Sequence, residues 1–488
     1  MRTFTRVLSG AAAVVVLVSS AASAQAQGGV AIVDITVLPM DRERVLFHRT
    51  VLIRDDRILS IGAKDSVPVP AGFRRLEFDA DVTLMPGLVD AHTHLRYDGD
   101  LTLYLAGGVT TVRNMNGGPE HLAWRRAVDQ GAFGPRILTA APVFHGPHPR
   151  SRAAATGIVD SLSRMGYDFL KVYDDLPGQS YQWLVEAARA NGMRIAGHIP
   201  SEVGLAGVLK AQQQSIEHAE QIIYHAMGDA WDWSRLAGIA DTIAAAHTAV
   251  TPTLEIIHAL IASVDEREAL FDRPEFRYVH PETQAFWLSD HRNSSAQNRV
   301  LADLQDALVR ELARRGVLGL GSGTIAAGQR ADLLFVRGNP LIDLQALERI
   351  EGVMSAGRWH SDGELGARLA ALMREYAPGR ALVAAAISGR AEEGMATYRR
   401  SVDSAAADAG LIGYLARIAR DEGRTENAIA LYKAALSYRP SSGAFYEGMA
   451  RTYMARGDIA ATRAAVQDAI RVEPGRRSAM DLLRQLQP

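Results

Sequence analysis

Short apolar segments alternate with helical stretches between residues 84 and 317, and this alternation is the feature that most constrains the fold. The segments LMPGLVDAHTHL, GVTTVRNM, RILTAAPV, DFLKVY, RIAGHIP, QSIEHAE and TAVTPTL have the composition of buried strands. Helical patterns such as SYQWLVEAARANG separate most of them. This alternation predicts βα units around a parallel sheet. We therefore expect an α/β fold with a (β/α)8-type TIM barrel over residues 84–320.

Several of these predicted strands end in a residue that can bind a metal ion: His92, His94, Lys171, His198 and His218. In such a barrel, active-site groups lie at the C-terminal ends of the strands, so these side chains should converge. Two histidines that are two residues apart in a strand face the same side and form half of a zinc site. Because the chain has no cysteine, other ligands must be histidine, a carboxylate or a modified lysine.

Lys171 lies inside the predicted strand DFLKVY. A buried lysine is costly unless it is paired or modified. A lysine with a lowered pKa can react with CO₂ to give a carbamate, an anionic bridge between two metal ions. The alternative is an ion pair between Lys171 and either Asp174 or Asp175.

The stretch from Leu308 to Phe335, LVRELARRGVLGLGSGTIAAGQRADLLF, looks like two ends of a longer sequence joined together. A predicted helix leads into the start of a strand, and a glycine-rich entry to another domain follows directly. One βα unit of roughly 30 residues is therefore absent from the barrel. Three alternatives remain for this gap: the segment RGVLGLG supplies a short strand, the barrel stays open with exposed strand edges, or a partner chain fills the gap.

The segments on both sides of the barrel alternate in the manner of strands. We expect residues 27–83 and 321–362 to fold together as one small β-sandwich domain. Residues 1–26 have a positive start, an apolar core and small residues near Ala24 and Ala26, which predicts a signal peptide and export to the periplasm or the medium. The alternative for this segment is an N-terminal membrane anchor.

The last hundred residues repeat with a period of 34, visible in Gly389, Gly423 and Gly457 and in Pro440 and Pro474. This spacing resembles the tetratricopeptide repeat, which has two antiparallel helices per unit. We expect helical repeats over residues 375–488, two of them clear and one degraded, and we expect them to pack against the neighbouring domain for stability. Such arrays bind proteins or serve as structural or dimerisation elements.

The motifs MPGLVDAHTHL, GVTTVRNM, DFLKVYDD, AGHIP, SIEHAE and GTIAAGQRADLLFVRGNPL together resemble the metal-dependent amidohydrolase superfamily, in its imidazolonepropionase-like and prolidase-like branch. The resemblance covers roughly residues 30–360. It implies hydrolysis of an amide-like C–N bond through a metal-activated hydroxide, with one or two divalent ions, zinc being the expected metal. His92 and His94 would hold one ion. Lys171 as its carbamate, His198 and His218 would hold the other, with Lys171 and His218 as catalytic residues.

The sequence departs from this family at the eighth strand. Relatives carry an aspartate there within GTD, a tripeptide that this chain lacks. Four other aspartates are weak substitutes: Asp290, Asp303, Asp306 and Asp332. Asn114 stands where many relatives have an aspartate. Candidate substrate contacts are His145, Tyr173 and Tyr224; His145 and His148 are otherwise exposed loop histidines, and the two tyrosines otherwise pack the pocket.

Two functions from different classes remain open. The first is an exported metal-dependent hydrolase, impaired by the missing aspartate, that acts on a small amide or dipeptide-like substrate. The second is a non-catalytic scaffold derived from such an enzyme, with a protein partner for the repeats; a recent deletion or an error in the recorded sequence would also explain the gap. A net charge of −2 and a charged fraction of 22% favour neither nucleic acid nor an anionic membrane as a partner. We expect no membrane span after signal removal, and a homo-oligomer is a possible assembly.

Overall fold

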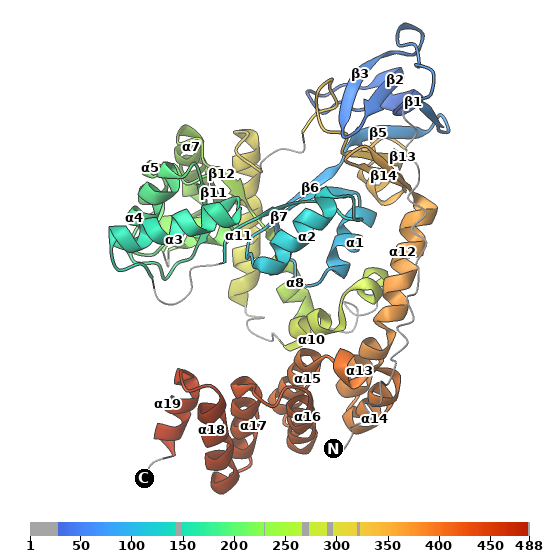
Figure 1. Ribbon diagram of the computed structural model, residues 1–488. Helices are drawn as coiled ribbons and strands as arrows, with labels where there is room; N and C mark the ends of the chain where they lie inside the picture. Colours follow the sequence, from blue (N-terminus) through green and yellow to red (C-terminus); the bar gives the residue numbers. More distant parts are fainter. Residues whose placement is uncertain are drawn as a thin grey trace, which may run out of the picture.

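A computed structural model describes residues 28–142, 148–228, 230–265, 273–289, 296–319 and 323–486. Figure 1 shows a strand-rich region, a central region of strands and helices, and a C-terminal array of helices. The predicted signal peptide, residues 1–26, lies outside the described residues. In the part of the chain that is described, no helix is long and apolar enough to cross a membrane.

Strands from both flanks form one eight-stranded sheet. They are β1 (Val30–Val37), β2 (Leu46–Arg54), β3 (Arg57–Ala63), β4 (Arg74–Glu77), β5 (Val82–Pro86), β13 (Leu333–Arg337), β14 (Ile350–Ser355) and β15 (Arg358–Ser361). Their order is β15-β14-β13-β5-β1-β2-β3, and β4 pairs with β1. The flanks do fold together as predicted. The expected sandwich is instead a single sheet, because β5 hydrogen-bonds to β1 on one side and to β13 on the other.

The predicted strand LMPGLVDAHTHL is in fact two strands in different sheets. β5 ends at Pro86 in the flanking sheet, and β6 (Leu88–Thr93) begins the central region. Gly87 lies between them, where an added Cβ atom would lie 2.1 Å from Thr110 Oγ1. A side chain has no room at this close approach, so a glycine is required where the chain passes from one sheet to the other.

All seven predicted strands of the central region are present and parallel to their neighbours. One sheet has the order β6, β7 (Val109–Asn114), β8 (Arg136–Thr139). The other contains β9 (Phe169–Val172), β10 (Arg194–Gly197), β11 (Ser215–Glu217) and β12 (Ala249–Thr251), again neighbours in chain order. A single bridge between Ala140 and Phe169 connects the two sheets. The described residues therefore form two parallel sheets in succession, and the closed ring of a barrel is not confirmed.

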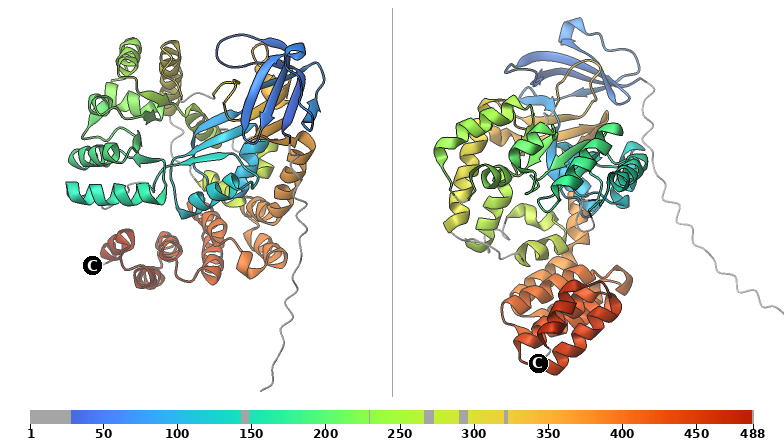
Figure 2. Two further views of the ribbon diagram at one scale, coloured as in Figure 1. Left: turned by 45° about the horizontal axis from the view of Figure 1, so that its top comes forward. Right: turned by 90° about the vertical axis from the view of Figure 1, so that its left-hand side faces the viewer.

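Helices follow the strands and lie outside them (Figure 2). They are α1 (Gly99–Ala106), α2 (Pro119–Asp129), α3 (Arg152–Met165), α4 (Gly178–Ala190), α5 (Gly204–Lys210), α6 (Ala219–Met227), α7 (Leu236–Ala245), α8 (Leu254–Asp265), α10 (Pro281–Ser289) and α11 (Ala296–Arg314). The largest apolar core of the region lies between these helices and β9 to β12. It buries Leu170, Ile216 and Val250 on the strands and Leu184, Ile222 and Leu304 on the helices.

The junction after α11 supplies a short substitute for an eighth strand. Leu318 forms a parallel bridge with Val250 of β12. The Val250 amide donates to Val317 O at 3.0 Å, and the Gly319 amide donates to Val250 O at 3.0 Å. Within the described ranges, β6 pairs only with β7, so the far edge of the first sheet stays open. Of the three alternatives, the short strand from RGVLGLG is represented in the described residues by this single bridge at Leu318, which does not join the two edges.

The C-terminal region is an array of helix pairs. Its helices are α12 (Asp362–Glu375), α13 (Ala377–Ile387), α14 (Ala391–Ser401), α15 (Ala409–Asp421), α16 (Thr425–Tyr438), α17 (Gly443–Ala455), α18 (Ile459–Val472) and α19 (Arg477–Gln485). Gly389, Gly423 and Gly457 have φ angles of 77°, 75° and 79°, so the period of 34 recurs in the backbone. Ala285 and Leu288 of α10 belong to the same apolar cluster as the repeats. The prediction that the repeats pack against the neighbouring domain is confirmed, because α10 shares their apolar core.

Candidate active site

The histidines predicted to bind metal lie at or just after the C-terminal ends of β6, β10 and β11. The ring centroids of His92 and His218 are 4.5 Å apart, those of His198 and His218 are 5.0 Å apart, and those of His92 and His94 are 5.4 Å apart. The parallel arrangement of the strands brings residues that are far apart in sequence to the same edge, as expected for such sheets. The four imidazoles therefore form one cluster.

Lys171 lies on β9, a strand that is buried at every position. Its side chain is fully buried, and Nζ has no hydrogen-bond partner among the described residues. Burial lowers the pKa of Lys171 to about 8, because the charged form loses its hydration. Asp174, one of the two predicted partners, hydrogen-bonds to His198 instead, and Asp175 lies near His148. The alternative of a direct ion pair for Lys171 is therefore wrong.

The four imidazoles are held neutral by their surroundings. Burial lowers the pKa of His94 to about 3, and it lowers the pKa values of His92, His198 and His218 as well. A neutral imidazole keeps one ring nitrogen with a free lone pair, as a metal ligand must. Two such atoms, His92 Nε2 and His198 Nε2, are buried without a hydrogen-bond partner in the described residues.

The opposite nitrogen of three rings is engaged by a neighbour. His92 Nδ1 donates to Glu217 Oε2 at 2.7 Å, and His198 Nδ1 donates to Asp174. His218 Nδ1 lies 2.7 Å from Thr253 Oγ1. Partners of this kind fix the tautomer and the orientation of a metal-binding histidine. The buried nitrogens and their fixed rings fit a metal site, which is the donor chemistry that the sequence predicts.

In the described part of the chain, the ligand atoms of the strand-end histidines do not form one compact set of three. Among the described residues, the trio of His or acidic side chains whose ligand atoms all lie within 4.8 Å of one another is His280, Glu282 and Asp408. The strand-end histidines are not such a trio.

Sequence reasoning missed the trio of His280, Glu282 and Asp408. It lies where α10 meets α15, and Tyr97 donates to Glu282 while its ring stacks on His280 at 3.5 Å between centroids. Burial and the nearby Glu282 raise the pKa of Asp408 to about 6. No local pattern connects residues about 130 positions apart, so the sequence held no signal for this cluster.

Sequence reasoning also missed Arg113 and Glu217. Both lie on parallel strands, with side chains 3% and 0% exposed, and Arg113 Nη1 donates to Glu217 Oε1 at 2.8 Å. Burial on its own would raise the pKa of Glu217, but the hydrogen bond from His92 and the charge of Arg113 hold that pKa well below its usual range. A signal was available: one charged residue inside each of two apolar strands, VTTVRN and SIE, predicts a buried pair.

The candidate substitutes for the missing aspartate lie elsewhere. Asp332 belongs to the flanking sheet, where it pairs with Arg330 at 2.8 Å and accepts from the Ala356 amide. Asp303 and Asp306 lie on α11, with Asp306 3.5 Å from His258 Nε2. Asp290 lies outside the described residues.

A different acid, Glu220, lies close to a site histidine. Its Oε1 lies 4.0 Å from His218 Nδ1, on the edge of the ring that faces Thr253. Burial raises the pKa of Glu220 to about 7. Asn114 is structural: it accepts from the Leu95 amide and donates to Thr139 Oγ1, which connects three strands.

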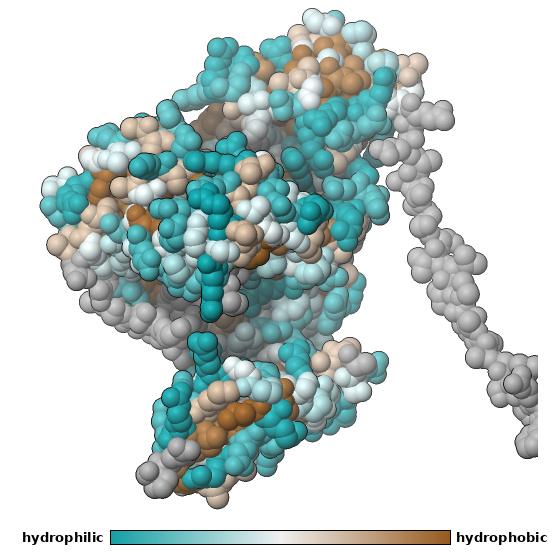
Figure 3. Space-filling model, turned by 60° about the vertical axis from the view of Figure 1, so that its left-hand side comes forward, coloured by the Kyte–Doolittle hydropathy of each residue, from teal (hydrophilic) through white to brown (hydrophobic). Residues whose placement is uncertain are grey.

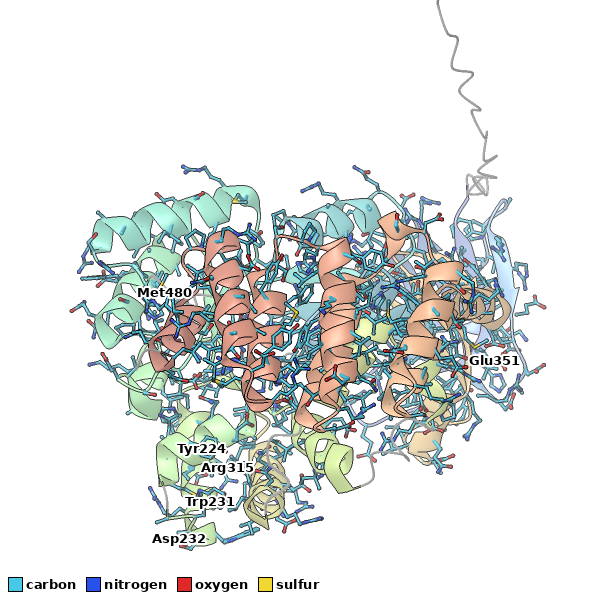
Figure 4. All side chains as sticks on the ribbon, turned by 90° about the horizontal axis from the view of Figure 1, so that it is seen from below. Tyr224, Trp231, Asp232, Arg315, Glu351 and Met480 are labelled. Carbon is cyan, nitrogen blue, oxygen red and sulfur yellow. The ribbon has the colours of Figure 1, made fainter. Side chains whose placement is uncertain are left out.

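The predicted substrate residues have different outcomes. The Tyr173 ring packs on His198 at 4.2 Å between centroids, with Lys171 Nζ 5.2 Å from it, so it lines the cluster. Tyr224 lies on α6 and is 46% exposed, in the same part of the view as Trp231 and Arg315 (Figure 4). His145 lies outside the described residues, and the contact of any of the three with substrate stays a prediction.

Comparison with known proteins agrees with both resemblances. Residues 419–486 match the family model of the tetratricopeptide repeat. Among solved structures, bottromycin amidohydrolase is 23% identical, with 70% of this chain and 90% of that chain covered and a TM-score of 0.53. Another amidohydrolase is 18% identical, with 68% of this chain and 98% of that chain covered and a TM-score of 0.51. A protein from Bifidobacterium longum assigned as a prolidase is 20% identical, with 71% of this chain and 99% of that chain covered and a TM-score of 0.50.

These similarities show that the chain shares the fold of amidohydrolase-like and prolidase-like proteins. No curated protein sequence matches it.

Proposed function

We propose that the protein is an exported, metal-dependent hydrolase that cleaves amide-like C–N bonds. The observation that carries this proposal is a set of three buried nitrogen atoms without hydrogen-bond partners in the described residues: His92 Nε2, His198 Nε2 and Lys171 Nζ. Buried polar atoms of this kind are costly unless a ligand satisfies them. Bottromycin amidohydrolase and the other similar structures support the choice of reaction, and the predicted signal peptide supports export.

The seven parallel strands support a barrel of the (β/α)8 type that has lost most of its eighth unit. They follow one another in chain order through β6 to β12, with the bridge between Ala140 and Phe169 connecting the two sheets. The bridge at Leu318 stands at the eighth position. The cluster then lies at the C-terminal ends of the strands, where barrel enzymes hold their active sites.

In this proposal His92 and His94 bind one ion, and His198 and His218 bind a second. Lys171, with its pKa lowered to about 8, carries a fraction of neutral amine near neutral pH that can add to CO₂ with release of one proton, and the resulting carbamate would offer anionic oxygen ligands to the ions. Bound divalent ions would polarise the substrate carbonyl and lower the pKa of a coordinated water. Glu217, Asp174 and Thr253 hold the three imidazole rings in place. Tyr173 covers the side of His198 and limits the access of water to it.

The missing aspartate limits the rate that this site can reach. Loss of a general base costs about 10²–10⁴-fold in rate. Val317, Leu318 and Gly319, at the eighth strand position, carry no group that can exchange a proton. Slow hydrolysis of a dipeptide or of an N-acyl amino acid is therefore the expected activity.

Metal content per chain, measured by elemental analysis on folded protein purified without chelator, tests the proposal. Two ions support the binuclear site, and a screen of dipeptides would follow. One ion supports a site formed by Lys171, His198 and His218. A folded protein without metal, which also fails to take up added Zn²⁺, would contradict the proposal.

The second candidate function is a scaffold that binds a protein through its repeats. The tetratricopeptide match over residues 419–486 favours it, because such repeats commonly bind peptides or proteins. Figure 3 shows apolar residues gathered on the surface of the repeat array. Ile459 and Met480 on this array are 50% and 36% exposed. A folded protein without metal would leave this function as the better explanation.

A further inference from the structure

Arg113 and Glu217 form a buried ion pair between the two parallel sheets of the central region. Arg113 lies on β7 and Glu217 on β11, and their side chains are 3% and 0% exposed. The guanidinium also lies over the Phe169 ring, 4.4 Å from its centroid. A buried pair of this kind is weak evidence for a contribution to stability, because desolvation offsets much of the attraction.

The geometry of the pair is not the one that would best neutralise its charges. A guanidinium and a carboxylate pair most strongly with two parallel hydrogen bonds. Here Arg113 reaches only Glu217 Oε1, at 2.8 Å, and its second nitrogen donates to Ser215 Oγ at 3.0 Å. Ser215 Oγ in turn donates to the same carboxylate oxygen at 2.5 Å. The other oxygen, Oε2, is left for His92.

His92 completes this arrangement. Its Nδ1 donates to Glu217 Oε2 at 2.7 Å, while its Nε2 is buried and has no hydrogen-bond partner in the described residues. The histidine side chain is 5% exposed, so water does not compete for Nδ1. A carboxylate accepts and does not donate, so the proton of the neutral ring is held on Nδ1 and the lone pair on Nε2.

We propose that Glu217, held in place by Arg113 and Ser215, is a positioning residue that fixes the tautomer and direction of His92 as a metal ligand. This inference rests on the proposed function, because it assigns Nε2 to a metal ion. Residues that orient a metal-binding histidine typically change metal affinity or activity by 10- to 100-fold when they are replaced. Replacement of Glu217 by an apolar residue should therefore weaken metal binding by about that factor.

Two variants test the inference. Glu217→Gln removes the charge but keeps an oxygen that can accept from His92. Arg113→Met combined with Glu217→Leu removes the acceptor without leaving a buried charge unpaired, whereas Glu217→Leu alone would leave the buried Arg113 without its counter-ion. The matched control is Glu447→Gln in the repeats, a carboxylate 6% exposed that also accepts from arginine and serine side chains.

The first measurement is Zn²⁺ affinity by chelator competition, on folded and metal-stripped protein. We expect the double variant to lose about 10- to 100-fold in affinity, Glu217→Gln to lose less, and Glu447→Gln to bind as the wild type does. Equal affinities for the wild type and the double variant would overturn the inference. An equal loss in Glu447→Gln would also overturn it, because the effect would then be a general loss of stability.

The second measurement does not need a metal. Nitrogen NMR of histidine-labelled, metal-free protein distinguishes a protonated Nδ1 from a protonated Nε2, and the His92→Gln variant assigns the signals. We expect a protonated Nδ1 in the wild type and a mixture of tautomers in the double variant. A protonated Nε2 in the wild type would overturn the inference. A wild type that binds no Zn²⁺ but has the expected tautomer would count against the proposed function and leave the positioning of His92 supported.

Discussion

Replacing Lys171 by methionine is expected to stabilise the metal-free protein, although the lysine is central to the proposed site. The side chain is fully buried on β9, and Nζ has no hydrogen-bond partner in the part of the chain that is described. Methionine has a similar length and carries no charge. The substitution therefore removes a buried ammonium group and leaves the packing of the core nearly unchanged.

The size of the effect follows from the pKa. Burial lowers the pKa of Lys171 from 10.5 to about 8, and each pKa unit corresponds to about 1.4 kcal/mol. Below pH 8 the ammonium group is charged in both states, so the folded protein carries the whole penalty of about 3 kcal/mol. Between pH 8 and 10.5 the unfolded chain binds more protons than the folded one, so the stability of the wild type rises with pH. The advantage of the methionine variant should fall to less than half by pH 9.5.

Urea denaturation followed by tryptophan fluorescence measures this difference. Five of the six tryptophans lie in the strand-containing regions and Trp287 lies on α10 beside the repeats, so the signal reports mainly on the strand-containing regions. The control is Lys210→Met on α5, where the lysine is exposed and the change should stay within about 0.5 kcal/mol at every pH. Metal-free Lys171→Met that is less stable than the wild type at pH 7 would refute the reasoning.

Added metal should reverse the order of stability. With Zn²⁺ and bicarbonate, the wild type gains binding free energy of about 4.1 kcal/mol when the metal concentration is a thousand times its dissociation constant, which exceeds the penalty of about 3 kcal/mol. Lys171→Met cannot form a carbamate and should gain less. If both proteins gain equally, Lys171 does not contribute to metal binding and the bridging role is wrong.

Two other changes test the repeats and their junction with the central region. Gly423→Ala should destabilise the repeats by about 1 kcal/mol, because φ is 75° at this position; no heavy atom lies within 4 Å of the added Cβ, so the cost comes from the backbone conformation and not from a clash. Thermal unfolding followed by circular dichroism measures the loss. The control is Gly475→Ala, where φ is not positive, and an equal loss there would contradict the reasoning. Asp408→Asn should stabilise the protein at pH 7.5 by up to about 3 kcal/mol, because the folded pKa of about 6 lies above the ordinary 3.8 and the ionised form is penalised. That gain should disappear below pH 4, where the carboxyl is protonated in both states, and a gain that persists there would contradict the assignment.

The sequence predicted the parts of the fold that depend on local periodicity. The spacing of Gly389, Gly423 and Gly457 placed the repeats, because each glycine adopts the same positive φ at the same turn. Strand-end residues were also predictable, since parallel strands bring their C-terminal ends to one edge whatever helices lie between them. The single sheet of the flanks was not predictable, because the pairing of β5 with β13 joins residues some 250 positions apart.

The side chains around the histidines were harder to predict for the same reason. Which nitrogen of His198 is engaged depends on Asp174, which the local sequence YDFLKVYDD offers only as an alternative partner of Lys171. The lysine and the aspartate are three positions apart on a strand and the turn after it, so their side chains need not face each other. Spacing alone predicts which residues share an edge, but the direction of each side chain depends on packing.

The open edge of the first sheet gives the pair of Arg113 and Glu217 a second consequence. In the described residues, one backbone bridge, between Ala140 and Phe169, connects the sheet of β6 to β8 with that of β9 to β12. A complete barrel would connect them again through its eighth strand, next to β6. Here the hydrogen bonds from Arg113 and His92 to Glu217 connect β7 and β6 to β11 across the interior. The same carboxylate that orients His92 therefore also connects the strands that carry the proposed metal site. A loss of stability alone would not isolate its positioning role, whereas the tautomer of His92 does.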